Sequence, residues 1–272
     1  EAFAKWKTSH EPFHWFVEFY GIMANGGFDV IVGNPPYVSA SKIRLQYDVL
    51  YLETGTCPDI YAWCLERSCQ LLSSTGRTGM IVPLSLTFSS DFQPLRDLLL
   101  RRNKVNWLSS FGRIPSALFN YDVRVRNAIH LGSRAGLDSA QFSTRLHRWF
   151  DQERPALLSL LLYARFAPRA WQGIVPKISS QHLCDALQAL LLGDATRVGQ
   201  LLATRDGAAR LYFKKTAYNW LAFSIDPPPC FDKSGELIEQ TQLDSLAVAN
   251  KSDLTPLFLL LNGKLVYVLW YV

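Results

Sequence analysis

Short apolar runs alternate with amphipathic stretches through the first half of the chain. The runs at 28–33 ("FDVIVG"), 78–86 and 104–112 are rich in β-branched residues, which predicts buried strands. Between them, the stretches 58–75 and 89–103 space their apolar residues as helices do. This strand–helix alternation predicts an open α/β sheet.

A fourth predicted strand, 122–134, follows the third without an intervening helix. Within it Val123, Val125 and Asn127 alternate with two arginines. Two consecutive strands without a helix between them predict an antiparallel hairpin at the edge of the sheet.

The pattern weakens in the second half. We expect a first domain at 1–137 and an additional, smaller α+β region at 138–272. The elements predicted in this region are a strand at 145–150, helices at 153–166 and 179–194, one strand or a hairpin at 210–225, and a hairpin turning at Asn262-Gly263.

Composition is that of a globular protein: 49% of the 272 residues are hydrophobic and 13% are aromatic. The five cysteines and five histidines lack metal-ligand spacing, so we expect reduced thiols and no metal site. No secretion signal or convincing membrane span is present in the sequence, which favours the cytoplasm. The chain begins with Glu1 and ends within an apolar run, so we expect a piece of a longer protein.

Charge is unevenly distributed. The formal net charge is +5, whereas residues 124–215 contain 14 Lys and Arg against 6 Asp and Glu, a local balance of +8. The rest of the chain therefore carries −3. A basic segment beside a slightly acidic one suits a polyanionic partner, although an ordinary solvated face has the same composition.

The strand at 28–33 ends in "NPPY". Ligands of open α/β sheets bind beyond the carboxyl ends of the strands, and Asn34 lies at that position. Pro35 and Pro36 stiffen the loop and leave its carbonyl groups free to accept hydrogen bonds. Tyr37 adds a flat ring. Two acceptors beside a stacking surface suit a planar group that carries an NH2, such as an adenine turned out of its helix.

"GNPPY" after an apolar strand resembles the catalytic motif of DNA adenine-N6 methyltransferases. The fuller stretch 12–38 ("PFHWFVEFYGIMANGGFDVIVGNPPYV") resembles the large restriction–modification methylases, and the resemblance continues to about Arg134. It implies the C-terminal part of a Rossmann-like class I methyltransferase sheet. It also implies S-adenosylmethionine as donor, double-stranded DNA as partner and a bacterial or archaeal cytoplasm. Nuclease and target-recognition domains are often fused to such methylases. The resemblance therefore implies that 1–137 is the catalytic half of the methyltransferase domain and that 138–272 leads into an incomplete target-recognition domain.

The resemblance assigns roles to single residues. Asn34 and the Pro35 carbonyl would accept hydrogen bonds from the adenine amino group, and Tyr37 would stack on the base. Phe119 matches the second aromatic clamp best, with Tyr121 as the weaker candidate.

Three further residues have more open readings. Glu18 matches an acidic position near the adenosyl part of the donor, although a solvated charge explains it as well. Arg124 and Arg126 are candidates for phosphate contacts or for exposed charges on an edge strand.

A glycine-rich donor loop following a strand is not found in the sequence. Gly26 and Gly27 precede the first predicted strand, and "SSFGRIP" after the third lacks a second glycine. We therefore expect the donor loop to lie outside this chain and residues 1–272 alone to be inactive.

Other functions remain open at this stage. Asn-Pro-Pro-Tyr loops also occur in methylases of protein glutamine and of RNA, which present a planar NH2 group too. A degenerate methylase-like module could instead bind DNA without catalysis. The DNA recognition sequence, a fused nuclease activity and the oligomeric state are not readable from these residues.

Overall fold

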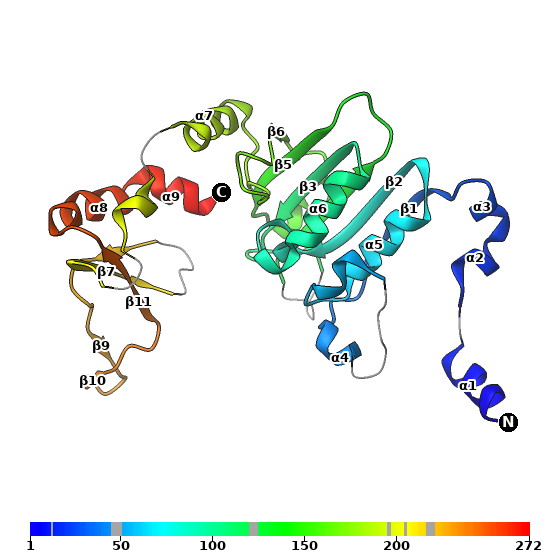
Figure 1. Ribbon diagram of the computed structural model, residues 1–272, viewed down its shortest axis with the longest axis horizontal. Coiled ribbons are helices and arrows are strands. Elements are labelled where there is room, and N and C mark those ends of the chain that lie inside the picture. The colour runs from blue at the N-terminus through cyan, green and yellow to red at the C-terminus, as the bar shows by residue number, and fades with distance from the viewer. Residues whose placement is uncertain (12, 45–50, 120–124, 195–196, 204–205, 216–220) are drawn as a thin grey trace. The chain divides into compact units, whose positions relative to one another are not determined.

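The computed structural model describes residues 1–272 except 12, 45–50, 120–124, 195–196, 204–205 and 216–220 (Figure 1). The chain forms two compact units, Glu1–Leu191 and Leu192–Val272. Each unit has its own sheet and its own apolar core.

The first unit contains the predicted sheet. Its strands are β1 (Phe28–Gly33), β2 (Leu72–Pro83), β3 (Val105–Phe111), β4 (Asn127–Ser133), β5 (Ala140–His147) and β6 (Ala164–Phe166). Its helices are α1 (Ala2–His10), α2 (Trp15–Glu18), α3 (Tyr20–Ala24), α4 (Ala40–Arg44), α5 (Tyr61–Leu71), α6 (Gln93–Arg102) and α7 (Gln181–Leu192). Short 3-10 turns cover Glu53–Thr56, Leu84–Thr87, Ser90–Phe92 and Asp151–Ala156.

The strands pair in the order β1-β2-β4-β3-β5-β6. β1 is parallel to β2 and β3 is parallel to β5, whereas β4 is antiparallel to both of its neighbours. This mixed sheet with parallel strands confirms the predicted α/β class. The antiparallel pair β3–β4 is formed as expected, but it lies inside the sheet because β5 and β6 continue the sheet beyond β3.

Continuation of the sheet through β5 also moves the domain boundary. The predicted boundary at 137/138 lies inside the first unit, because β5 pairs with β3 along most of its length. The helix predicted at 153–166 is not formed. Pro155 lies within a short 3-10 turn there, and the Tyr163 hydroxyl lies 2.6 Å from that of Ser109 on β3. The part of this segment before residue 164 is irregular, and its last three residues form β6.

Helices α5 and α6 lie against one face of the sheet (Figure 1). Tyr61 at the start of α5 is fully buried and stacks on Phe92, with 4.9 Å between the ring centroids. On the opposite face Phe111 is covered by Trp149 and Leu157. The core thus holds the sheet from both sides around β3.

The strand directions define one functional edge. Because β1, β2, β3 and β5 all run the same way, their carboxyl ends lie at the same edge of the sheet, where antiparallel β4 begins. We call this the carboxyl edge. It is the edge at which open α/β sheets bind their ligands.

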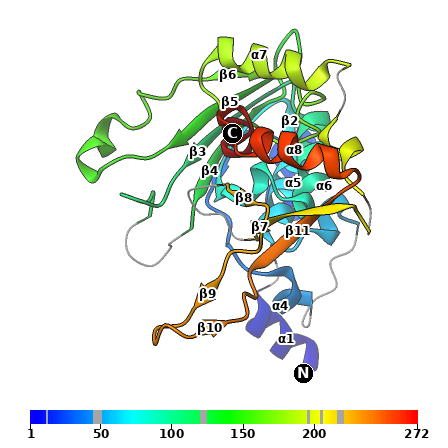
Figure 2. The same cartoon turned by 90° about the vertical axis from the view of Figure 1, so that its left-hand side faces the viewer.

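The second unit is a small α+β fold, as predicted for this part of the chain. Its elements are β7 (Ala209–Lys214), β8 (Phe223–Ser224), β9 (Cys230–Phe231), β10 (Leu237–Ile238), β11 (Leu243–Val248), α8 (Leu254–Leu261) and α9 (Lys264–Tyr271), with 3-10 turns at Val198–Leu201 and Lys251–Asp253. β7 pairs with β11 and β8, and β9 pairs with β10 in an arm that extends from this sheet (Figure 2).

The hairpin predicted at Asn262-Gly263 was wrong. The residues before and after it form helices α8 and α9. Leu257 and Leu261, four residues apart, pack with Leu211 of β7 and Val248 of β11. This helical spacing buries more apolar surface against the sheet than an exposed hairpin would. Among the described residues no single helix has the length and apolar content to cross a membrane; only α8 with its preceding turn and α9 taken together, bent by 64°, meet that test.

Candidate active site

The Asn-Pro-Pro-Tyr loop lies at the carboxyl edge, as the sequence predicts. Asn34 directly follows Gly33, the last residue of β1, and is exposed. Its side chain makes no hydrogen bond to another described residue. Pro35 is buried while Pro36 is exposed. The amide of Asn34 is therefore presented to solvent from a loop with restricted backbone angles.

Tyr37 is fastened to the sheet through its hydroxyl. The hydroxyl donates to the Ile81 carbonyl of β2 at 3.1 Å. It accepts a hydrogen bond from Nδ2 of Asn127, the first residue of β4, also at 3.1 Å. Burial raises the pKa of Tyr37, while the bond from Asn127 opposes that rise, so the hydroxyl stays a neutral donor at physiological pH.

The residues after Tyr37 are held by backbone hydrogen bonds to the segment that precedes α5. The Ala40 amide donates to the Pro58 carbonyl at 2.6 Å, and the Ile60 amide donates to the Val38 carbonyl at 3.0 Å. These bonds tie the loop to the segment that enters α5. The loop is thus held at both ends before any ligand binds.

Phe119 lies in the loop that leaves β3 at the same edge. It is half-buried, and the loop before it is held by the Ser116 amide, which donates to the Trp149 carbonyl at 3.1 Å. Topology brings this loop to the edge that carries Asn34, but no described ring contact joins Phe119 to Tyr37. The clamp role of Phe119 stays a prediction. Tyr121 and Arg124 lie outside the described residues.

Arg126 is exposed immediately before β4. Its carbonyl accepts a hydrogen bond from the Leu84 amide at 2.8 Å, which places it beside the turn that follows β2. The same turn ends near Phe88, whose ring lies 5.5 Å from Nζ of Lys177. Burial and the nearby Arg126 lower the pKa of Lys177. A second cation, not singled out from the sequence, therefore accompanies Arg126 at the carboxyl edge.

Glu18 lies elsewhere. It is exposed at the end of α2, beside Phe19. The Phe19 ring contacts Phe28 at the start of β1, with 5.3 Å between the centroids, whereas Asn34 follows the end of that strand. The structure therefore does not bring Glu18 to Asn34, and its donor-binding role stays a prediction.

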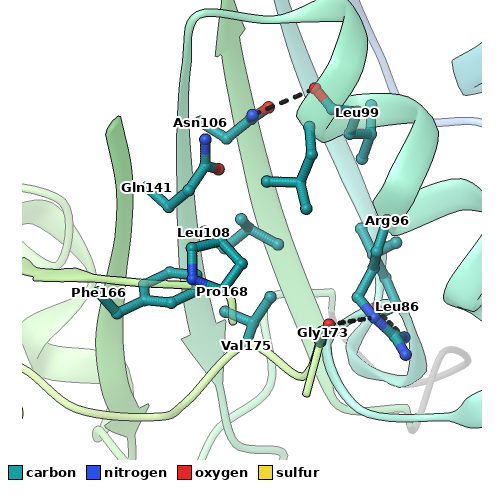
Figure 3. A pocket seen from close by; sticks show the side chains of 11 residues that line it. Leu86, Arg96, Leu99, Asn106, Leu108, Gln141, Phe166, Pro168, Gly173 and Val175 are labelled. Carbon is teal, nitrogen blue, oxygen red and sulfur yellow. Dashed lines mark hydrogen bonds between the residues drawn. The ribbon is translucent and has the colours of Figure 1, made fainter. Parts of the chain in front are cut away.

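Two hollows of the first unit differ greatly in size. One of about 630 Å³ lies beside β1 and is lined mainly by apolar side chains, Val30, Val32 and Trp63 among them. The other, about 20 Å³, lies in the core between α6 and the sheet (Figure 3). It has room for about one water molecule, not for a substrate.

Arg96 borders the small cavity as a structural cation. Its Nε donates to the Gly173 carbonyl at 2.8 Å (Figure 3), and its Nη1 donates to the carbonyls of Leu86 and Ser89 at 2.9 and 2.8 Å. Burial lowers its pKa. With its donors used by carbonyl groups, Arg96 joins the chain segments behind the carboxyl edge and does not face a ligand.

The described residues do not fit a class I donor loop. Gly26 and Gly27 have positive φ angles but precede β1, and a Cβ on Gly27 would lie 2.5 Å from the Leu71 carbonyl oxygen. Gly112 follows β3, yet it packs against the His147 backbone. At both positions backbone groups already occupy the space that the carboxylate of the donor would need. Likewise, no cluster of three metal-binding side chains occurs within the described part of the chain.

Asn127 is, with Lys177, a residue at this edge that sequence reasoning did not assign to the site. The alternation along 122–134 placed it on the same side as the valines, which marked an unusual polar residue at an inward position. Nothing in the sequence paired it with Tyr37, 90 residues away. Only the placement of β4 next to β2 brings the two side chains together.

Comparison with known proteins covers the part of the chain that contains this loop. Residues 2–115 match the family model of the Eco57I restriction-modification methylase. Over 102 residues the chain is 32% identical to RM.MjaORFECS2P of Methanocaldococcus jannaschii. That protein is named provisionally as a type II restriction enzyme and methyltransferase. Over 128 residues it is 31% identical to the type II methyltransferase M.PaeR7I of Pseudomonas aeruginosa. The predicted similarity to restriction–modification methylases is thereby confirmed.

The coverage is partial. The two matches take in 38% and 44% of this chain but only 8% and 21% of those relatives. Among solved structures, the chain is similar to the DrdV–DNA complex, with 16% identity, a TM-score of 0.45 and coverage of 58% of this chain and 19% of that one. It is also similar to a nuclease-deletion mutant of LlaGI bound to a DNA substrate mimic, with 14% identity, a TM-score of 0.42 and coverage of 56% and 18%.

Proposed function

We propose that this chain forms the part of a site-specific DNA adenine-N6 methyltransferase that holds the target adenine, the acceptor of the methyl group. The parent enzyme would belong to a restriction–modification system. The observation that carries the proposal is the position of Asn34. Its free amide lies beyond the carboxyl end of β1, beside a tyrosine ring that is tied to β2 and β4. The match of residues 2–115 to a restriction-modification methylase family supports it.

The chemistry assigned to these residues is the holding of an amino group. The Asn34 Oδ1 and the Pro35 carbonyl would accept its two N–H bonds, which turns the nitrogen lone pair away from the loop. Methylation would form an N–C bond as the S–C bond of the donor sulfonium breaks and leaves a neutral thioether. The nitrogen then carries positive charge, which the two fixed acceptor dipoles would stabilise until one of its protons leaves to water. Tyr37 would stack on the base, with Phe119 on the other face.

S-adenosylmethionine is proposed as the source of the methyl group. The described residues do not fit its binding loop, so no donor contact is assigned to them. We expect residues 1–272 alone to show no methyl transfer and to bind the donor weakly. Micromolar binding measured by calorimetry with this chain would contradict that expectation.

Double-stranded DNA is the proposed partner. Arg126 at the carboxyl edge, and Arg124 by its position in the sequence, are assigned to phosphate groups that flank the target base. The basic stretch 124–215 would provide the wider electrostatic attraction.

The test compares two asparagines that flank β1 in the full-length natural protein that contains this sequence. DNA, RNA and protein are offered with tritiated S-adenosylmethionine, and methylated nucleosides are identified by mass spectrometry. Asn34→Ala should lower kcat by roughly 100-fold or more while DNA affinity stays within about 2-fold. Asn25→Ala, at the opposite end of the strand, should retain activity.

The outcomes are distinct. A near-normal rate for Asn34→Ala would refute its role. Tritium in RNA or protein, with none in DNA, would replace the proposed substrate. Salt-sensitive DNA binding without any transfer would identify a non-catalytic module.

A further inference from the structure

The contact between Asn127 and Tyr37 links the proposed site to the centre of the sheet. Asn127 is only 1% exposed, and its backbone pairs with Pro83 of β2 on one side and with Phe111 of β3 on the other. Its side-chain amide donates to the Tyr37 hydroxyl at 3.1 Å. A rigid, buried group therefore holds the end of a half-buried ring.

We propose that Asn127 is a positioning residue for the target base, which it serves by fixing the ring of Tyr37. The inference rests on the proposed function, because it assumes that the target base stacks on a face of the Tyr37 ring. Asn127 itself does not touch the base in this proposal.

The chemistry of a phenol explains why the hydroxyl is an effective point of attachment. The Tyr37 hydroxyl donates to the Ile81 carbonyl and accepts from Asn127, so both of its hydrogen-bonding functions are used. The hydroxyl lies at the far end of the ring, where anchoring it restrains the swing of the whole side chain. Since an O–H of a phenol prefers the plane of the ring, the same two bonds also oppose rotation of the ring about its own axis.

Preorganisation is the expected benefit. Asn34 follows β1 directly, and Tyr37 is three residues further along a loop stiffened by two prolines. With the ring fixed, the loop presents the amide and the stacking surface in one geometry before the base arrives. A ring that must be immobilised on binding lowers affinity and misplaces the reacting nitrogen.

The test is a double-mutant cycle in the full-length natural protein. Asn127→Ala removes the donor, and Tyr37→Phe removes the hydroxyl but keeps the stacking ring. Asn127→Ala should lower kcat/KM for DNA by roughly 10-fold, the effect of losing one hydrogen bond. Tyr37→Phe should lower it by at least as much, because it loses the bonds to both Asn127 and Ile81. The double variant should be no slower than the slower single variant, because both changes remove the same contact.

A spectroscopic readout separates positioning from general damage. With 2-aminopurine at the target position of the mapped DNA site, a flipped base stacked on a fixed ring is quenched. The fluorescence of the complex should rise for Asn127→Ala, and at least as much for Tyr37→Phe. Asn106→Ala is the matched control, since Asn106 is equally buried but lies near the start of β3, away from the carboxyl edge, and bonds to His130 and Asn103.

The control variant should lower the melting temperature without changing the fluorescence. Its effect on kcat/KM should add to that of Tyr37→Phe, which means that the two changes are not coupled. Additive losses in the double variant, or unchanged fluorescence for Asn127→Ala, would overturn the positioning role. In either case methyl transfer by the wild type and its loss in Asn34→Ala would leave the proposed function standing. Absence of transfer by the wild type would overturn both.

Discussion

The guanidinium of Arg154 lies over the indole ring of Trp149, with its carbon 4.6 Å from the ring centroid. The same group donates to the Ala117 and Leu118 carbonyls at 3.1 Å each. Arg154 thus connects the segment that covers the sheet with the two residues that precede Phe119. If Phe119 contacts the target base, as its sequence position predicts, Arg154 fixes the position of the backbone that carries Phe119.

Replacing Arg154 should therefore affect use of the DNA substrate. We expect Arg154→Ala to lower kcat/KM of the full-length protein by roughly 10-fold, because two charge-assisted hydrogen bonds and a cation–π contact are lost together. Steady-state kinetics with varied DNA provide the measurement. Arg145→Ala removes the same charge from an exposed position on β5 and should have little effect. Equal losses in the two variants would remove Arg154 from this role.

Two glycines at the centre of the sheet should respond differently to the same substitution. A Cβ on Gly132 would lie 2.5 Å from Nδ2 of Asn103 and 2.6 Å from Oγ1 of Thr78, both buried. A Cβ on Gly79 would lie 3.2 Å from Val32 and 3.3 Å from Leu131, whose side chains are exposed and can move.

Gly132→Ala should accordingly lower the free energy of unfolding by about 1–3 kcal/mol. Gly79→Ala should change it by less than about 1 kcal/mol, since the strand conformation suits alanine at least as well as glycine. Urea unfolding of both variants checks the pair. Similar losses at the two positions would show that the buried amide and hydroxyl relax as readily as the exposed side chains.

The early part of the fold was predictable because its signals are local. The helices before β2 and β3 each bury one continuous face, as their apolar spacing predicts. The strand before Asn34 was predicted at the right residues, but its predicted burial was wrong. It lies at the edge of the sheet, with Val30 and Val32 exposed. Asn34, the prolines and Tyr37 were found for the same reason: they are contiguous, and a strand end fixes where they lie.

Features that depend on distant partners were not predictable. The sequence pattern at 153–166 predicts a helix, but Tyr163 and Leu157 instead contact β3 and the helix does not form. Asn262-Gly263 predicts a hairpin turn, but the flanking residues form helices because α8 packs on β7. Asn127 belongs to the site only through strand order, which no short motif specifies.

A buried histidine should make stability depend on pH. His130 is fully buried on β4, and burial lowers its pKa from the ordinary 6.5 to about 4. Its Nε2 lies 2.8 Å from Oδ1 of Asn106, which also accepts from Asn103, so the neutral ring donates this bond. Between pH 6.5 and 4 the unfolded chain binds the proton that the folded chain excludes.

Stability should therefore be complete above about pH 6.5 and fall as the pH drops, by up to about 3 kcal/mol at pH 4. Urea unfolding at several pH values, with His130→Gln as the non-titrating variant that can still donate to Asn106, isolates this contribution. The difference between wild type and variant should shrink toward low pH. His182→Gln, at an exposed position on α7, should keep the wild-type profile. A constant difference across the range would contradict burial of a neutral His130.

Arg126 should contribute to DNA affinity through charge alone. It is exposed at the carboxyl edge, one residue before the asparagine that holds Tyr37. A single phosphate contact adds about 0.9 to the steepness of log Kobs against log salt concentration. Arg126→Ala should therefore weaken binding of specific and nonspecific duplexes alike and reduce that slope by about 1.

Arg77 supplies the control for this measurement. It is also exposed and lies on β2, but it pairs with Ser133 at the far end of β4. Arg77→Ala removes the same charge and should leave the slope unchanged, since that end of the sheet lies away from the proposed DNA path. DNA affinity measured by fluorescence anisotropy between 50 and 200 mM salt distinguishes a phosphate contact of Arg126 from a general effect of net charge. Equal slopes for the two variants would assign Arg126 to the solvated surface, the alternative that its place in the sequence left open.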